Sequence, residues 1–191
     1  MSYTADPDPL CYPGTTVLRN LLDIRDAELL DEVELALFLT RAAEPVPPGA
    51  FDVEHLMGVH RFLFQDVYPW AGQLRTIRIG KQNNWFCYPE YIASELARAF
   101  AELGDPQALG RMPLRAFSSH VAHFMAELNA VHPFREGNGR TQLTFLVMLA
   151  EHAGHGFDAG KLERGRVMRA MIESFSGDEG ELAALIEDAL A

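Results

Sequence analysis

Residues 132–140 of the chain read His132-Pro-Phe-Arg-Glu-Gly-Asn-Gly-Arg140, directly before the almost wholly apolar residues 141–153. An apolar stretch of that length is typical of a helix at the centre of its domain. Glycines on both sides of Asn138 permit positive φ and close backbone approach, so consecutive N–H groups can form an anion-binding nest at the helix start. The helix dipole and the Arg140 guanidinium add positive charge there. The stretch therefore predicts a phosphate-binding loop.

Two further residues of the same loop indicate catalysis. A phosphate beside the nest would repel the Glu136 carboxylate unless a divalent metal lay between them, and proteins commonly hold Mg²⁺ by one carboxylate plus substrate phosphates. His132 is the side chain suited to accept a proton near neutral pH. The loop thus predicts a phosphate-bearing substrate, a metal ion and a base that activates a hydroxyl. The chain contains neither a P-loop nor a dinucleotide fingerprint.

The rest of the sequence predicts an all-α domain with one small β-hairpin. Helix caps at Asp26 and Asp52, and apolar residues at helical spacing, predict about seven helices in total. The others are expected over residues 89–104, 113–129, 141–153, 160–175 and 179–190. Alternation over residues 74–79, followed by a turn-rich segment, predicts a hairpin across residues 74–88. A length of 191 residues suits one domain spanning 1–191.

Composition limits the partners. Lys and Arg total 16 against 27 Asp and Glu, a formal net charge of −11. A surface that tracks nucleic-acid phosphates needs clustered basic residues, so no nucleic-acid partner is expected. No apolar run reaches the roughly 18 residues of a membrane helix, and the acidic, proline-broken N-terminus does not resemble a signal peptide. The expected location is the cytoplasm, with secretion as an effector the alternative.

The loop resembles the signature of Fic domains, H-P-F-x-[DE]-G-N-G-R-x-x-R. The likeness extends further along the chain. Residues 12–20 are similar to the opening segment of bacterial Fic proteins, residues 60–76 to the helix and turn before the family's hairpin, and residues 174–178 to a segment near its C-terminal end. The resemblance implies a Fic-like helical fold over nearly the whole chain.

The resemblance also implies an activity: a protein nucleotidyltransferase that moves AMP from ATP to a Ser, Thr or Tyr hydroxyl of a target protein (AMPylation). His132 would be the general base, and Glu136 would hold Mg²⁺ on the phosphates. The remaining loop positions would bind the nucleotide; these are Gly137, Asn138, Gly139 and Arg140. Phe134 is expected to anchor the loop in the core.

The hairpin over residues 74–88 would correspond to the family's flap, which binds an extended segment of the target by strand addition. Its target-binding residues would be Thr76, Ile77, Arg78, Ile79, Gly80 and Lys81. The resemblance also implies an inhibitory pattern, Ser/Thr-x-x-x-Glu-Gly/Asn, which occurs in autoinhibited members of the family. The nearest match, residues 40–44, is followed by Pro45. A toxin-like activity, if inhibited, would therefore involve a separate antitoxin-like chain.

One position departs from the signature. Leu143 stands where the family has a second arginine, which generally contacts the γ-phosphate. Two alternatives to AMP transfer from ATP follow: another nucleotide or phosphate donor, or a catalytically inactive Fic-fold binding module. A third alternative, a metal-dependent hydrolase, would use His120, His123 and His132, although no H-E-x-x-H motif supports it.

Overall fold

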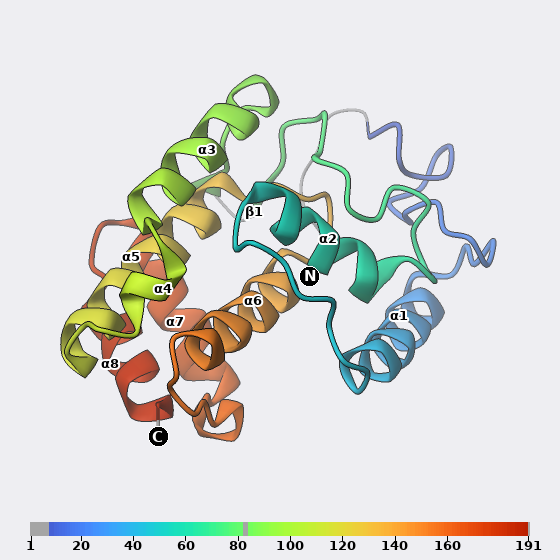
Figure 1. Cartoon of the computed structure of the whole chain (residues 1–191). Helices are drawn as coiled ribbons and strands as arrows, with labels where there is room; N and C mark the ends of the chain where they lie inside the picture. Colours follow the sequence, from blue (N-terminus) through green and yellow to red (C-terminus); the bar gives the residue numbers. More distant parts are fainter. Residues whose placement is uncertain (1–7, 82–83, 191) are drawn as a thin grey trace. The chain divides into compact units, whose positions relative to one another are not determined.

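The computed structural model describes residues 8–81 and 84–190 (Figure 1). Within these ranges lie eight α-helices and one two-stranded antiparallel sheet, which confirms the all-α prediction with one small hairpin. The helices are α1 Ala27–Ala42, α2 Val53–Phe64, α3 Ile92–Leu103, α4 Pro106–Leu109, α5 Leu114–Val131, α6 Asn138–His152, α7 Arg164–Phe175 and α8 Gly180–Ala189; the strands are β1 Gly80–Lys81 and β2 Asn84–Trp85. The four-residue α4 is the helix that the sequence prediction lacks.

The chain divides into two compact units. The first contains the described residues up to Ile92 together with Pro133–Thr141, and the second contains Ala93–His132 and the residues from Gln142 onward. Helix α6 thus begins in the first unit and continues in the second. The expectation of one domain over residues 1–191 stays a prediction.

Local capping sets the helix starts in the first unit. The Asp26 side chain accepts a hydrogen bond from the Leu29 N–H (2.9 Å), and Asp52 does the same for His55 (2.8 Å), as the sequence predicts. Helices α1 and α2 pack together. The buried core of this unit includes aromatic and aliphatic side chains with at most 1% of their surface exposed: Leu56, Val59, Leu63, Phe64, Val67, Ile79, Ile92 and Phe134.

The hairpin is shorter than the sequence predicts. Ladder pairing joins Gly80 to Trp85 and Lys81 to Asn84, and one further bond runs from the Phe86 N–H to the Ile79 carbonyl (3.2 Å). Below that point the buried Arg75 guanidinium donates to the Ile77 carbonyl (2.7 Å) and the Cys87 carbonyl (2.6 Å). A side chain thus binds backbone oxygens at the hairpin base where a regular ladder was expected. Residues 82 and 83 lie outside the described residues.

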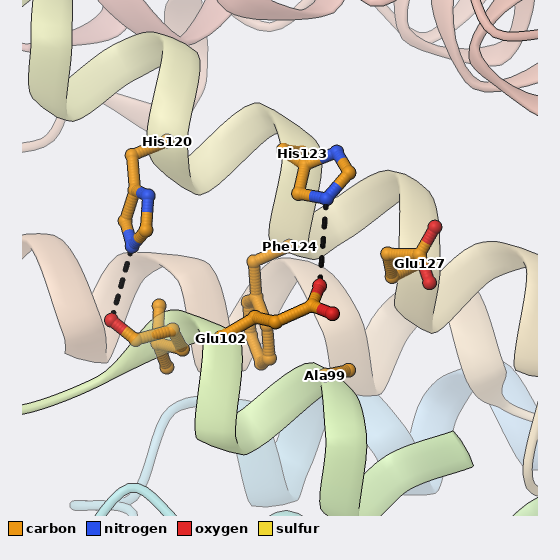
Figure 2. A pocket seen from close by; sticks show the side chains of 7 residues that line it. Ala99, Glu102, His120, His123, Phe124 and Glu127 are labelled. Carbon is orange, nitrogen blue, oxygen red and sulfur yellow. Dashed lines mark hydrogen bonds and ion pairs between the residues drawn. The ribbon is translucent and has the colours of Figure 1, made fainter.

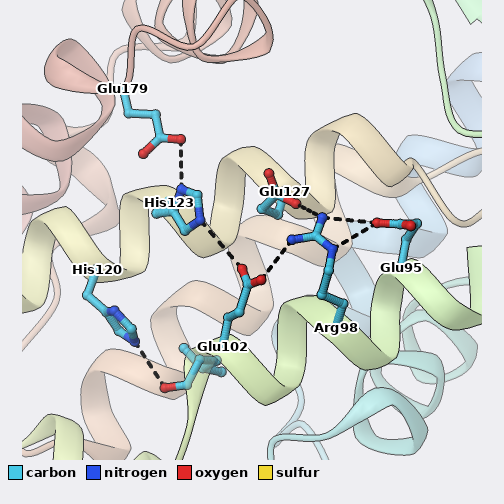
Figure 3. A network of polar contacts seen from close by, with 8 residues as sticks. Glu95, Arg98, Glu102, His120, His123, Glu127 and Glu179 are labelled. Carbon is cyan, nitrogen blue, oxygen red and sulfur yellow. Dashed lines mark hydrogen bonds and ion pairs between the residues drawn. The ribbon is translucent and has the colours of Figure 1, made fainter.

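In the second unit, α5 packs against α7 and α8. The side chains predicted to face inward from α5 are buried, as expected: Phe117, Val121, Phe124, Met125 and Leu128. A polar network joins α3 to α5, with Arg98 paired to Glu95, Glu102 and Glu127 (Figure 3). Among the helices of the described residues, none combines the length and the hydropathy that a bilayer span requires.

Candidate functional site

The loop before α6 is closed by its own side chains. Asn138, 1% exposed, accepts the Phe134 N–H through Oδ1 (2.9 Å) and donates Nδ2–H to the Phe134 carbonyl (2.7 Å). Gly137 has φ +79°, and a Cβ placed there would lie 2.5 Å from the Phe64 ring. Both constraints leave room only for glycine, because a side chain is strained at positive φ and would overlap the ring. Gly137 therefore uses the positive φ that the sequence allows, and its role in nucleotide binding stays a prediction.

His60 of α2 packs against the loop of residues 132–140 and hydrogen-bonds to it. Its ring stacks on Phe134 with centroids 3.9 Å apart, so Phe134 is the core anchor that the sequence predicts. The Gly72 N–H donates to His60 Nδ1 (2.8 Å), so the proton lies on Nε2, which donates to the Glu136 carbonyl (3.0 Å). Burial lowers the pKa of His60 to about 4, and the ring is neutral at pH 7. The protonated Nε2 of His60 therefore holds the Glu136 carbonyl in place through a hydrogen bond.

Two arginines hold the start of the loop. The backbone N–H of Arg75 donates to the Pro133 carbonyl (2.9 Å), and this bond links the hairpin base to the loop. Arg135 is 5% exposed and forms an ion pair with Asp8 (2.6 Å). A buried arginine that keeps a carboxylate partner is well stabilised, whereas either group alone would be costly. The loop backbone is thus fixed before any ligand arrives.

Helix α6 begins earlier than predicted, and this changes the role of Gly139. The Thr141 N–H donates to the Gly137 carbonyl (3.0 Å), so Asn138 and Gly139 lie in the first turn, where N–H groups have no acceptor inside the helix. Gly139 does not use the positive φ that glycine permits, because this residue is helical. A Cβ added at Gly139 would meet no protein atom within 4 Å. The fold itself therefore does not require glycine at position 139.

Three charged side chains meet at the start of α6. Glu136 Oε1 accepts the Gly137 N–H (2.9 Å) and lies 3.9 Å from Arg140 Nη2, and Arg140 forms an ion pair with Glu34 of α1. Burial raises the pKa of Glu136, and the neighbouring Glu34 charge acts in the same direction, against the Gly137 N–H and Arg140. A cation beside Glu136 would stabilise its ionised form.

The surroundings of Glu136 fit a Mg²⁺ ion that is only partly held by protein. Within residues 8–81 and 84–190, no group of three or more His, Cys, Asp or Glu side chains gathers as a metal site. Mg²⁺ keeps several waters and is commonly bound by one or two carboxylates plus phosphate oxygens. A single carboxylate beside a helix start whose N–H groups could hold a phosphate matches that pattern.

His132, the predicted base, ends α5 and belongs to the second unit. Its backbone is left-handed (φ 49°, ψ 63°), and its N–H donates to the Leu128 carbonyl (2.9 Å). The Asn129 carbonyl lies 3.3 Å from Nδ1 and can only accept, so Nδ1 carries the proton and Nε2 the lone pair. A non-glycine residue in this conformation costs roughly 1 kcal/mol, which is typical of functional positions.

The predicted flap residues lie in the first unit but differ in exposure. Thr76 is exposed, and three others are half-buried, namely Ile77, Arg78 and Lys81. Ile79 has 0% of its surface exposed, so its side chain cannot contact a target, and Gly80 is buried as well. Arg78 lies over the rings of Tyr88 (3.9 Å) and Trp85 (4.6 Å).

The histidines of the hydrolase alternative bind separate partners. His120 Nε2 donates to the Leu103 carbonyl (3.0 Å), whereas His123 lies 2.9 Å from Glu179 and 3.7 Å from Glu102. Figures 2 and 3 show the His120 ring facing the C-terminal end of α3 and the His123 ring facing the Glu102 side chain. Their arrangement is that of structural side chains between helices.

Two residues of the site escaped sequence reasoning. Glu34 and Tyr68 are 7% and 3% exposed, and the Tyr68 hydroxyl donates to Glu34. The sequence could have indicated Glu34, because its four-residue spacing from Leu30 and Phe38 places it on the same face of α1. A carboxylate within an apolar face points to a buried counter-charge.

A helical fold that brings a helix start, a carboxylate and an arginine together has the arrangement typical of domains that handle phosphate groups. The chain belongs to the Fic/DOC family, whose model matches residues 50–150. It is 56% identical to "Probable protein adenylyltransferase y4lH" of Sinorhizobium fredii, with 96% of both chains covered. It is 40% identical to protein adenylyltransferase VbhT of Bartonella schoenbuchensis over 96% of this chain and 39% of that protein.

Solved structures agree with the fold. The BepC protein of Bartonella tribocorum with bound AMPPNP superposes with a TM-score of 0.84 at 28% identity, covering 95% of this chain and 96% of BepC. The N-terminal Fic domain of a VirB-translocated effector protein of Bartonella quintana with bound ADP gives 0.85 at 26%, covering 95% and 94%. The family and fold predictions are confirmed.

Proposed function

We propose that the chain is a protein adenylyltransferase that moves AMP from ATP to a hydroxyl group of a target protein. The observation that carries this function is the fixed loop at the start of α6, where backbone N–H groups, Glu136 and Arg140 converge within one unit. The names of the relatives support the activity, and the AMPPNP and ADP bound by two Fic structures support ATP as the donor.

The reaction needs one proton acceptor. The hydroxyl oxygen of the target forms a bond to the α-phosphorus, and the bond from that phosphorus to the bridging oxygen breaks, so pyrophosphate leaves with the electron pair. The proton of the hydroxyl passes to His132 Nε2, the nitrogen whose lone pair the Nδ1–Asn129 hydrogen bond leaves as acceptor. His132 directly precedes Pro133, the first residue of the loop.

Phosphate binding falls to the start of α6. The N–H groups of Gly137, Asn138 and Gly139 would donate hydrogen bonds to the nucleotide phosphates, with the helix dipole behind them. The Gly137 N–H would do so in place of its present bond to Glu136 Oε1. Arg140 would neutralise charge on the leaving phosphates. Glu136 would hold Mg²⁺, which when bound neutralises part of the phosphate charge.

Target binding is assigned to the flap over residues 74–88. Strand addition uses backbone groups, so a buried side chain such as Ile79 is compatible with it. An antitoxin-like inhibitor and a cytoplasmic location stay predictions; relatives named VirB-translocated effectors favour secretion as the alternative to test by fractionation.

The test is transfer of label from α-labelled ATP to proteins of a cell lysate in the presence of Mg²⁺. His132→Asn is the sharpest variant, because asparagine tolerates the left-handed conformation at this helix end. Loss of a general base lowers transfer about a hundredfold or more, while the melting temperature stays close to that of the unmodified chain. Equal labelling by His132→Asn, or no labelled protein with any nucleoside triphosphate, would overturn the proposal.

The choice of donor has its own test, because Leu143 is half-buried on α6 and cannot bind a phosphate. Leu143→Arg restores the signature. We expect this variant to use ATP at a lower concentration than the unmodified chain, since an added guanidinium contributes a charge-assisted hydrogen bond. Faster labelling of the unmodified chain by another nucleoside triphosphate would instead favour a different donor.

A further inference from the structure

A buried carboxylate of α1 faces the candidate phosphate-binding arginine. Glu34 has 9% of its side chain exposed, against 28% for Arg140. One carboxylate oxygen accepts from Arg140 Nη2, and the other accepts from the Tyr68 hydroxyl. Both oxygens of Glu34 therefore have donors, which is the condition under which a buried carboxylate is stable.

Aromatic rings bound the same guanidinium. Its central carbon lies 4.7 Å from the centroid of the Phe64 ring of α2 and 5.1 Å from that of the Phe38 ring of α1. Arginine binds favourably over aromatic faces at these distances. Glu136 lies 3.9 Å from Arg140 Nη2. Rings from two helices and carboxylates from two segments thus define where the guanidinium lies.

Moving Arg140 away would leave Glu34 buried without its counter-charge. Removing one partner of a largely buried ion pair costs more stability than a surface ion pair contributes. Burial and the Glu34 charge also raise the pKa of Tyr68 well above its ordinary range, so its hydroxyl remains a donor throughout neutral pH. The arrangement keeps Arg140 in one place before a nucleotide binds.

We propose that Glu34, supported by Tyr68, is a positioning residue that holds the Arg140 guanidinium in place for the phosphates of the nucleotide. The inference rests on the proposed function of Arg140 and adds a residue outside the signature loop. A donor fixed in advance binds a developing or incoming charge without reorganisation, which is the source of most electrostatic catalysis. Glu34 itself touches neither nucleotide nor target.

A purely structural role is the competing explanation. Glu34 and Phe38 lie on α1, and Tyr68 follows α2, so the cluster also joins these elements. Loss of that joint would lower the stability of every variant, whether or not Arg140 is present. A role exercised through Arg140 disappears once Arg140 is removed.

A double-mutant cycle on the full chain separates the two roles. The probe is AMPPNP with Mg²⁺, bound in a calorimeter without any target protein. We expect Glu34→Ala to weaken binding about tenfold and Arg140→Ala by about tenfold or more, the scale of one charge-assisted hydrogen bond. The double variant should bind as Arg140→Ala alone does.

Two further variants refine the cycle. Glu34→Gln keeps an acceptor for Arg140 at nearly the same volume, so it should recover part of the affinity and serves as the test if Glu34→Ala does not fold. Tyr68→Phe keeps the ring and removes only the hydroxyl; a loss of about two- to threefold is expected, within the range of one neutral hydrogen bond.

The outcomes are distinct. Losses that add in the double variant, or tighter AMPPNP binding by Glu34→Ala, would overturn the positioning role, the second result because Glu34 would then compete with phosphate for Arg140. An unmodified chain that binds no AMPPNP would overturn the proposed function and this inference with it. Binding by the unmodified chain with an additive cycle would remove the inference alone.

Discussion

The two glycines beside Asn138 meet different physical constraints. Gly137 has positive φ, and the Phe64 ring fills the space in which a side chain would lie. Gly139 is helical and has no protein atom within 4 Å of an added Cβ. The fold therefore explains Gly137 but not Gly139, which is consistent with the proposed approach of phosphate to the start of α6.

The glycine pair gives a matched prediction. Gly139→Ala should fold with equal or higher stability, because alanine is favoured over glycine in a helix by about 1 kcal/mol. It should weaken AMPPNP binding by about tenfold or more, since a methyl group stands where phosphate approaches the N–H groups. Gly137→Ala should instead lower the free energy of unfolding by about 2 kcal/mol.

Urea unfolding and calorimetric binding measure both variants of the pair. Unchanged affinity in Gly139→Ala would place the phosphates elsewhere. Unchanged stability in Gly137→Ala would contradict the close approach of Phe64.

At the scale of elements, the hairpin base depends on one side chain. Arg75 is 3% exposed and donates to carbonyls on both limbs, Ile77 and Cys87, while its N–H binds Pro133. Arg75→Met leaves these two carbonyl groups without that donor, which costs about 1–3 kcal/mol. We expect faster hydrogen exchange at the flap amides and a higher KM for the target protein.

The control for Arg75 lies in the same hairpin. Arg78 stacks on Trp85 and Tyr88, so Arg78→Met removes these ring contacts and keeps the Arg75 hydrogen bonds to Ile77 and Cys87. Arg78→Met should therefore leave flap exchange close to that of the unmodified chain. Equal exchange in both variants would show that Arg75 does not hold the flap.

In the second unit, His123 joins three elements through charge. It lies between Glu179, just before α8, and Glu102 of α3, with Arg98 and Glu127 beside them (Figure 3). The Glu179 carboxylate raises the pKa of His123 above its ordinary value near 6.5. A raised pKa in the folded state stabilises the fold fully below about pH 6.5, and the contribution is lost as the pH rises through the folded pKa.

The melting temperature should therefore fall more steeply between pH 6 and pH 8 in the unmodified chain than in His123→Gln. The contribution of His123 to the free energy of unfolding stays below about 1 kcal/mol, because its side chain is nearly half exposed. His120→Gln is the control, since His120 binds a backbone carbonyl (Figure 2) and should leave the slope unchanged. Parallel pH profiles for His123→Gln and the unmodified chain would contradict the link.

Sequence reasoning succeeded where the signals are local. The caps at Asp26 and Asp52 act within three residues, and the loop of residues 132–140 carries its own glycines and Asn138. It failed where partners are distant. Asp8 and Arg135 are 127 residues apart, and no spacing rule joins them. The shortened hairpin has a similar cause. The Arg75 guanidinium donates to the Ile77 and Cys87 carbonyls, whereas the local alternation of residues predicts backbone ladder bonds there.

At the scale of the whole molecule, the negative charge of the protein disfavours binding of the anionic nucleotide that we propose as its substrate. The formal net charge is −11, and at the start of α6 Glu34 and Glu136 together outweigh Arg140 by one charge. The position of the second signature arginine holds Leu143, which adds no positive charge. A nucleoside triphosphate would bring further negative charge, so we expect its binding to require a cation between Glu136 and the phosphates.

AMPPNP should accordingly bind at least about a hundredfold more tightly with Mg²⁺ than in excess chelator, a difference of two factors of ten in affinity. Glu136→Gln should remove most of that difference, because it loses the charge that holds the metal and relieves the repulsion of the free nucleotide. Leu143→Arg should reduce the difference from the other side, by supplying a fixed cation. Calorimetry of the three proteins with and without Mg²⁺ measures these effects, and tight binding by the unmodified chain in chelator would show that the backbone N–H groups and Arg140 overcome the acidic surroundings unaided.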